Sequence, residues 1–390
     1  MKRLFLALSL IASKAISLVA VFIFAYILDI TEVNKFSEVQ AIIQMIIPII
    51  SLQIPAALFR FSKVREFDGI VVSIFKYSTS IYILVIPLII ISLLGYYWLI
   101  ILPVVLSSIC LQVHLEVIRG RYNETLYYAG NLAFVIIYVV TSLLAINLIN
   151  SYVVIFACDI FSSMLVCLFL NRMHEQRLNY TSGFSKANFN DLLKYSIPLV
   201  ANAMLWWFST SGSILVSSLL VKGNSAAIAN INLKASLLIS TFSFIISNVY
   251  QRHLVECFED NDNKYRKELK NYIFKSFAMI LAVSVVNYLL FSWWLESFYP
   301  DYYVSSKLLL INVVSGVAYG FCAILGVDYI CRKRTSQSLV SVTLGMITTV
   351  LFCLYIRDDY GVIGVMFSFM IGFVVNLIVR VRDISVNLHR

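Results

Sequence analysis

Long runs of hydrophobic residues, separated by short polar breaks, dominate the chain from end to end. Each run has about 20 residues or more, and a helix of that length crosses the roughly 30 Å hydrocarbon core of a bilayer. The pattern predicts an all-α polytopic membrane protein with twelve transmembrane helices, at residues 4–28, 37–58, 70–93, 98–118, 127–149, 152–170, 195–220, 226–250, 271–294, 304–330, 337–356 and 362–379.

The polar breaks alternate in charge along the chain. Of the 30 basic residues, 24 fall in or near one set of alternate breaks and the two chain ends, four fall in or near the other set, and Lys14 and Lys234 lie in span interiors. Cytoplasmic loops carry an excess of lysine and arginine. The bias therefore predicts that both termini lie in the cytoplasm.

The longest polar stretch on the predicted cytoplasmic side, 171–190, reads as a linker because it contains Gly183, Ser182, Ser185 and several charges. It divides the spans into two sets of six. We predict an N-terminal six-helix bundle at 1–180 and a C-terminal one at 181–390. Paired bundles around a central cavity are a recurrent transporter architecture.

The overall composition agrees with this class of protein. Hydrophobic residues make up 60% of the chain and charged residues 13%, which excludes an ordinary soluble domain. The net charge of +9 could indicate nucleic-acid binding. In a membrane protein it more often reports basic cytoplasmic loops, and we interpret it so.

Polar residues fall on single faces of several predicted spans. Positions separated by four and seven residues lie close together around a helix. Such faces occur in the first two spans of each half, and these predict a substrate-binding cavity lined by Lys14, Gln44, Asn202, Trp206, Asn230, Lys234 and Thr241. Serine, threonine and asparagine can also serve only helix packing, and Trp206 could either stack on a sugar ring or pack in the core.

The two lysines inside spans carry the strongest signal, because a charge in hydrocarbon costs several kcal/mol. Lys14 could instead extend its amine to the interface, but it lies eleven residues beyond Arg3, which is about 16 Å along a helix. We therefore favour a cavity. Pro48 and Pro55 predict a bend in the second span.

Other polar residues have both structural and functional interpretations. Asp159 lies deep in its span and could bind a proton or cation for coupling, or be a buried and paired carboxylate. His114 is interpreted as structural, and Asp328 as an ion-pair partner of Arg332. The Gly316–Gly320 pair predicts close helix packing.

No catalytic motif stands out in the chain. The sequence Asp260–Asn261–Asp262 imitates the DxD motif of glycosyltransferases, but it lies in a predicted charged loop of about twenty residues, too short for a nucleotide-binding domain. Walker, GxSxG and HExxH motifs are absent from the sequence. We therefore expect a protein that is not an enzyme and has no cofactor.

Two segments of the second half resemble a known family. The stretch LLKYSIPLVANAMLWWF and, after a serine-rich segment and a short turn, AAIANINLKASLL are similar to the polysaccharide-transporter branch of the multidrug/oligosaccharidyl-lipid/polysaccharide exporter superfamily, the Wzx-type O-antigen flippases. The first helix with its lysine, and a second helix ending near Ala57–Leu58–Phe59–Arg60, also fit.

The resemblance implies a flippase for undecaprenyl-pyrophosphate-linked oligosaccharide, such as O-antigen repeat units of lipopolysaccharide, in the bacterial inner (cytoplasmic) membrane. It implies membrane lipids and a lipid-linked substrate as partners, with polymerase and chain-length proteins of the same pathway as further ones, and H⁺ or Na⁺ as a coupling ion. Lysine and amide side chains suit a pyrophosphate and sugars. A drug antiporter of the same superfamily, or a membrane-embedded polymerase, remains the alternative.

Overall fold

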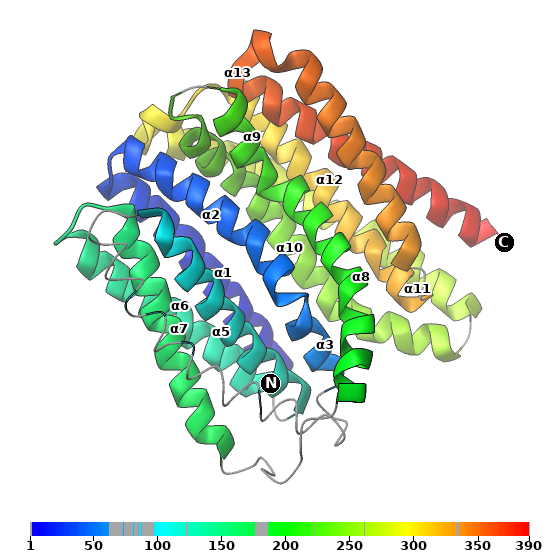
Figure 1. Cartoon of the computed structure of the whole chain (residues 1–390). Helices are drawn as coiled ribbons and strands as arrows, with labels where there is room; N and C mark the ends of the chain where they lie inside the picture. The colour runs from blue at the N-terminus through cyan, green and yellow to red at the C-terminus, as the bar shows by residue number, and fades with distance from the viewer. Residues whose placement is uncertain are drawn as a thin grey trace. The chain divides into compact units, whose positions relative to one another are not determined.

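The chain is described by a computed structural model over residues 2–61, 73, 81, 85, 87, 97–121, 124–175, 186–221, 223–260, 262–332 and 335–389. All regular secondary structure within these ranges is helical (Figure 1). Helices cover most of each predicted span that is described, and the third predicted span, 70–93, lies outside the described residues except at four positions. The all-α prediction is confirmed for this part of the chain.

Contacts divide the chain into two compact units, Met1–Met204 and Leu205–Arg390. The first unit contains α1 (Lys2–Ile27), α2 (Ile30–Ser51), α3 (Ile54–Phe61), the 3-10 helix η2 (Tyr97–Ile100), α5 (Ile101–Arg121), α6 (Glu124–Ile146), α7 (Tyr152–Glu175) and most of α8 (Lys186–Thr210). The second contains the end of α8, then α9 (Gly212–Leu220), α10 (Ser225–Asp260), α11 (Asp262–Phe298), the 3-10 helix η3 (Pro300–Tyr302), α12 (Ser306–Cys331) and α13 (Thr335–His389). The predicted division after residue 180 stays a prediction.

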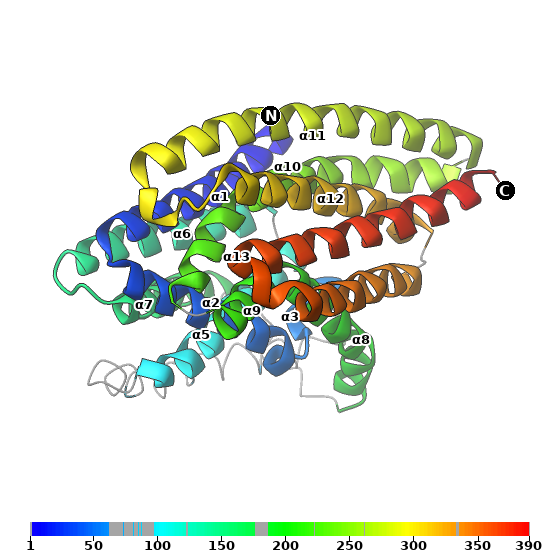
Figure 2. The ribbon, with the colours of Figure 1, turned by 90° about the horizontal axis from the view of Figure 1, so that it is seen from above.

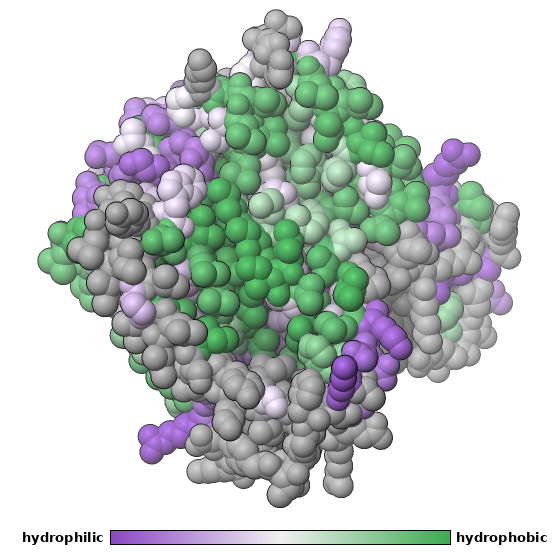
Figure 3. Space-filling view, viewed as in Figure 1, coloured by the Kyte–Doolittle hydropathy of each residue, from purple (hydrophilic) through white to green (hydrophobic). Residues whose placement is uncertain are grey.

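Several helices are long and apolar enough to cross a bilayer. Among the described residues there are nine such segments, or ten if the bent pair α8–α9 is counted as one span. Hydrophobic residues also cover much of the coloured surface in Figure 3, and large side chains such as Leu148, Leu219 and Tyr355 are exposed. A polytopic membrane protein follows from these features, whereas the count of twelve and the cytoplasmic termini stay predictions.

The second predicted span is broken, as its two prolines led us to expect. Helix α2 contains Pro48 and ends at Ser51, and Leu52 and Gln53 have left-handed backbone conformations with φ of 48° and 54°. Pro55 lies in the first turn of α3, where its missing N–H removes no helical hydrogen bond. The bend is therefore a complete interruption between two helices.

The core of the first unit joins the broken helix to its neighbours. Ala57 and Leu58 of α3 pack with Val113 and Val117 of α5 and with Leu192 of α8. These contacts place the start of α8 in the first unit.

Another cluster of the first unit is aromatic. Phe36 of α2 stacks on Phe156 of α7 with ring centroids 5.2 Å apart, and Phe24 of α1 contacts both Phe36 and Tyr138 edge to face. It joins α1, α2, α6 and α7.

Small residues set the spacing of α10 and α12 in the second unit. A Cβ atom on Gly316 would lie 2.9 Å from the Cα and carbonyl oxygen of Ser236, and one on Gly320 would meet the side chain of Ser243. Backbones can approach this closely only where side chains are absent. The predicted packing role of the Gly316–Gly320 pair is confirmed.

The prediction of a charged loop of about twenty residues before residue 271 is wrong. Helix α10 continues to Asp260 and α11 begins at Asp262, so the two helices extend well beyond their apolar runs (Figure 2). Their polar ends still bury one face, because Leu254 and Cys257 of α10 and Tyr265 and Leu269 of α11 are almost fully buried. Amphipathic packing thus continues the helices where hydropathy alone suggested that they stop.

Candidate functional site

The polar face of α10 lies within the second unit. Asn230 is completely buried, Lys234 is buried with 8% of its surface exposed, and Thr241 is half-buried. The same side of the helix continues through Leu238 and Phe244, which are exposed. Lys234 therefore lies where the buried part of this face meets its open part.

Lys234 has no compensating partner in the described part of the chain. It makes no hydrogen bond and no ion pair with any residue that the structure describes. The spanning helices around it, α10 from Ser225 to His253 and α12 from Ser306 to Val327, contain no acidic residue. A buried cation with no partner destabilises a protein, and this makes Lys234 the candidate residue for binding a ligand that supplies negative charge.

Trp206, at the end of α8, packs into the second unit. Its ring lies edge to face with Tyr319 of α12, with centroids 5.0 Å apart, and 5.6 Å from the Arg380 guanidinium carbon. Tyr319 in turn contacts Phe373 of α13. Part of the ring remains accessible, since Trp206 is half-buried.

Arg380 is the second buried cation of this unit, with only 1% of its surface exposed. Its Nε donates to Ser341 Oγ and Asn376 Oδ1 at 3.1 and 3.0 Å, Nη1 donates to the Cys322 carbonyl at 2.7 Å, and Nη2 donates to Ser338 Oγ at 2.8 Å. All four acceptors are neutral.

These contacts make Arg380 an anchor of the fold. The guanidinium also lies over the ring of Tyr329, at 5.5 Å, besides that of Trp206. Hydrogen bonds and cation–π contacts thus link α12, the end of α8 and both arms of α13, the parts of that helix before and after its kink at Gly361.

The sequence interpretation missed Arg380, because it placed this residue in a basic polar break just after the apolar run 362–379. That assignment is wrong, since α13 continues to His389 and buries the side chain. Asn376, one helical turn before Arg380, is a weak sequence signal that the polar face continues inside the fold, and its side chain supplies one of the acceptors.

The remaining predicted cavity residues are distributed between the two units. Lys14 of α1 and Gln44 of α2 lie in the first unit with exposed side chains. Asn202 belongs to α8, and its side chain lies outside what the structure describes. The structure brings Asn230, Lys234 and Thr241 onto one face, and their convergence with Lys14 and Gln44 on a central cavity stays a prediction.

Asp159 lies on α7 and belongs to the first unit, whereas α10 belongs to the second. Its side chain is half-buried, and its backbone carbonyl accepts a hydrogen bond from Ser163 Oγ at 2.7 Å. Within the described ranges, the structure has no group of three or more His, Cys, Asp or Glu side chains that could hold a metal ion. A role in ion coupling stays a prediction.

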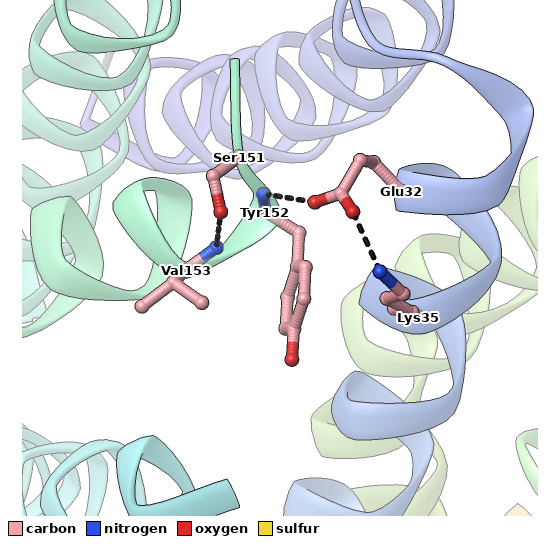
Figure 4. Close-up of polar contacts among 5 residues, drawn as sticks. All are labelled: Glu32, Lys35, Ser151, Tyr152 and Val153. Atoms are coloured by element: carbon pink, nitrogen blue, oxygen red, sulfur yellow. Dashed lines mark hydrogen bonds and ion pairs between the residues drawn. The ribbon is translucent and has the colours of Figure 1, made fainter. Parts of the chain in front are cut away.

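Glu32, in the first turn of α2, links two helices of the first unit that are far apart in sequence (Figure 4). Its carboxylate accepts a hydrogen bond from the backbone N–H of Tyr152, at 3.1 Å, and pairs with Lys35 at 2.9 Å. Tyr152 is the first residue of α7, so the negative charge lies at a helix N-terminus, where it is favourable. The first turns of α2 and α7 are therefore joined.

Two structural interpretations of charged or titratable residues are confirmed. Asp328 pairs with Arg332 at 2.9 Å and also accepts a hydrogen bond from Tyr265. His114 is fully buried, and its ring nitrogens bond the Cys110 carbonyl and the Asn171 side chain at 2.7 and 2.8 Å. These groups hold helices together and leave Lys234 as the candidate binding residue.

Neither a protein-family model nor a curated protein matches the sequence. Solved structures match it along nearly its whole length. Lipid II flippase MurJ, in an inward closed conformation, aligns with a TM-score of 0.69 and 13% identity over 98% of this chain and 87% of the flippase chain. An outward-facing multidrug resistance MATE family transporter of the MOP superfamily aligns with a TM-score of 0.67 and 13% identity, covering 98% and 94%.

A third structure is a MOP superfamily transporter from Pyrococcus furiosus, described as having a binding pocket of reversed polarity. It aligns with a TM-score of 0.61 and 11% identity over 98% of this chain and 94% of the transporter. At these identities the similarity shows a shared fold. The chain therefore has a fold found in a lipid flippase and in multidrug transporters.

Proposed function

We propose that this chain is a membrane transporter that flips a lipid-linked oligosaccharide, of the O-antigen repeat type carried on undecaprenyl pyrophosphate. It would move this substrate from the cytoplasmic to the periplasmic leaflet of a bacterial inner membrane by alternating access. The fold shared with a structure described as a lipid II flippase supports a lipid-linked substrate. The sequence resemblance to Wzx-type flippases supports the oligosaccharide.

The observation that carries this proposal is Lys234, a buried lysine with no carboxylate partner in the described part of the chain. A pyrophosphate brings negative charge through the membrane, and a fixed cation in apolar surroundings stabilises it more strongly than the same cation in water. Asn230 and Thr241, on the same face of α10, would supply hydrogen bonds to phosphate or sugar oxygens.

Other residues of the proposed site come from different helices. Lys14 would supply a second cation from the first unit, and Gln44 and Asn202 would supply amide groups. Trp206 would form a rigid wall for a sugar ring, because Tyr319 and Arg380 already hold its indole in place. The lipid tail would remain in the bilayer.

A small-molecule or drug antiporter is the second candidate, and it is favoured by the fold shared with multidrug transporters. Cationic drugs call for acidic residues in the binding site, whereas the spanning parts of α10 and α12 have none. Asp159 would then be the coupling site for H⁺ or Na⁺. A glycan polymerase is a weaker alternative, since the sequence offers no reactive cluster for it.

The test compares charge and volume at position 234. We expect Lys234→Ala and Lys234→Gln to reduce surface polysaccharide in a flippase-null strain by roughly 10- to 100-fold. This ratio corresponds to the loss of the binding free energy of one charged hydrogen bond in a buried site. Lys234→Arg should retain more activity because it keeps the cation. Lys307→Gln, an exposed lysine at the start of α12, is the matched control.

Membrane levels of each variant are measured alongside by immunoblotting. Full surface polysaccharide with Lys234→Gln would contradict the proposal. If that variant instead abolished resistance to cationic drugs in a sensitised strain, the antiporter would replace the flippase as the function.

A further inference from the structure

Helix α11 is much longer than a bilayer requires. Its 37 residues, Asp262–Phe298, extend about 55 Å, whereas the hydrocarbon core is roughly 30 Å thick. It packs against α10 and α12 in the second unit (Figure 2). A substantial part of the helix must therefore lie in the headgroup layer or beyond it.

The two sides of α11 differ sharply in burial. Tyr265, Leu269 and Ile280 belong to a stripe that is completely buried against the rest of the unit. On the opposite side, Val285, Leu289 and Trp293 are each more than 60% exposed. An exposed apolar face of this length on a membrane protein is a lipid-facing surface.

The same exposed side becomes cationic toward the start of the helix. We call this region the α11 patch, and it consists of Lys267, Lys270, Asn271, Phe274 and Lys275, all of them exposed. The spacing of three, four and seven residues places them next to one another on the helix surface. Phe274, with 74% of its surface exposed, lies among the three lysines.

The lysines of the α11 patch have no counter-charge in the described part of the chain. None of the three forms an ion pair or a hydrogen bond with a residue that the structure describes. Glu268 is the acidic residue within this stretch, and it faces His253 of α10 instead. The patch therefore presents an unneutralised positive charge on a lipid-facing helix.

The length of the apolar stretch places the patch at the membrane boundary. The twenty residues from Ser276 to Leu295 match the hydrocarbon thickness at 1.5 Å per residue. Phe274 and Lys275 then lie at the edge of the hydrocarbon, and Lys270 and Asn271 lie about 7 Å farther out, within the headgroup layer. Lys267 can reach the same layer with its long side chain.

We propose that the α11 patch binds the headgroup of an anionic phospholipid of the surrounding membrane. The lysine ammonium groups would surround the phosphate, the Asn271 amide would donate to it, and Phe274 would pack beside the glycerol and upper acyl chain. The apolar face continuing through Val285 would hold the acyl chains. This surface lies on the lipid-facing side of one helix and does not depend on the transported substrate.

The expected preference follows from the charge of the patch. Each lysine near an anionic membrane surface strengthens binding roughly fivefold, so three lysines give about 100-fold preference for an anionic lipid over a zwitterionic one. The preference should weaken at high salt, because the lysines are exposed and screened.

The experiment measures lipid binding to the full-length protein in a neutral detergent by native mass spectrometry. Dioleoyl phosphatidylglycerol and dioleoyl phosphatidylcholine are the two probes. We expect the triple variant Lys267→Gln, Lys270→Gln, Lys275→Gln to lose most of the phosphatidylglycerol binding and to keep its phosphatidylcholine binding. The triple Lys→Arg variant should bind both lipids as the parent protein does.

A second triple variant with the same change in net charge is the control. Lys186→Gln, Lys194→Gln and Lys307→Gln alter exposed lysines of α8 and α12, and this variant should retain phosphatidylglycerol binding. Equal loss in both triple variants would show a general effect of net charge and would overturn the site. Unchanged phosphatidylglycerol binding after removal of the three α11 lysines would overturn it as well.

Discussion

Three buried or nearly buried cations of the second unit illustrate how surroundings decide the role of a residue. Arg332 pairs with Asp328, and Arg380 is surrounded by neutral oxygen acceptors and two aromatic rings. Lys234 has neither kind of compensation in the described residues. The charges of both arginines are therefore compensated within the fold, whereas Lys234 is the candidate for binding a ligand.

Replacing Arg380 tests its role as an anchor. We expect Arg380→Met to lower the free energy of unfolding by on the order of 3 kcal/mol, because four acceptors lose a charged donor and two rings lose a cation. Arg382→Met is the matched control, since Arg382 lies two positions later on α13 with an exposed side chain. Thermal unfolding in detergent is the measurement, and equal melting temperatures of the two variants would contradict the prediction.

At the scale of elements, the local sequence explains where helices are interrupted, but it does not explain how closely they pack. Prolines interrupt α2 before α3, and Gly361, with φ of 52°, separates the two arms of α13. Glycine tolerates this conformation at no steric cost. The closeness of α10 to α12, in contrast, depends on Gly316 meeting the backbone of Ser236.

The contact between α10 and α12 predicts that a change from glycine to alanine affects stability differently at Gly316 and at Gly320. Gly316→Ala should destabilise the protein by about 1–3 kcal/mol, because the added methyl group would meet the backbone of Ser236, which cannot move aside. Gly320→Ala meets a serine side chain instead, so combining it with Ser243→Gly should restore stability. The measurement is thermal unfolding of the two single variants and the double variant. A double variant no more stable than Gly320→Ala would contradict the prediction.

At the scale of the whole molecule, the strongest expectation is topology. The asymmetric distribution of basic residues predicts that both termini and the 171–190 segment lie in the cytoplasm. The short loop between α6 and α7, which Glu32 joins to the start of α2, would then face the periplasm.

Reporter fusions test this topology directly. A reporter that is active only in the periplasm should be active after Ser151 and silent after Ser182, because an odd number of spans separates the two sites. A cytoplasm-active reporter at the same positions should give the opposite pattern. Activity of the periplasmic reporter at Ser182, with silence at Ser151, would refute the predicted orientation.

Much of the fold and part of the site could be predicted from the sequence, for identifiable reasons. The apolar runs predicted the helices, the prolines predicted the break after α2, and the spacing of Asn230, Lys234 and Thr241 predicted one face of α10. Arg380 was misassigned because hydropathy alone ends a span at the first charge. Hydropathy likewise predicts a loop at the charged ends of α10 and α11, where the structure has helix.

The amino-acid sequence by itself determined the all-helical membrane class and the polar face of α10, because hydropathy and helical period are properties of neighbouring residues. Only the tertiary structure decided which cations have partners. The acceptors of Arg380 come from Cys322, Ser338 and Ser341, about 40 to 60 positions away, whereas Lys234 meets no acceptor in the described residues. Charge compensation acts through space, so the role of a buried cation depends on how the helices pack.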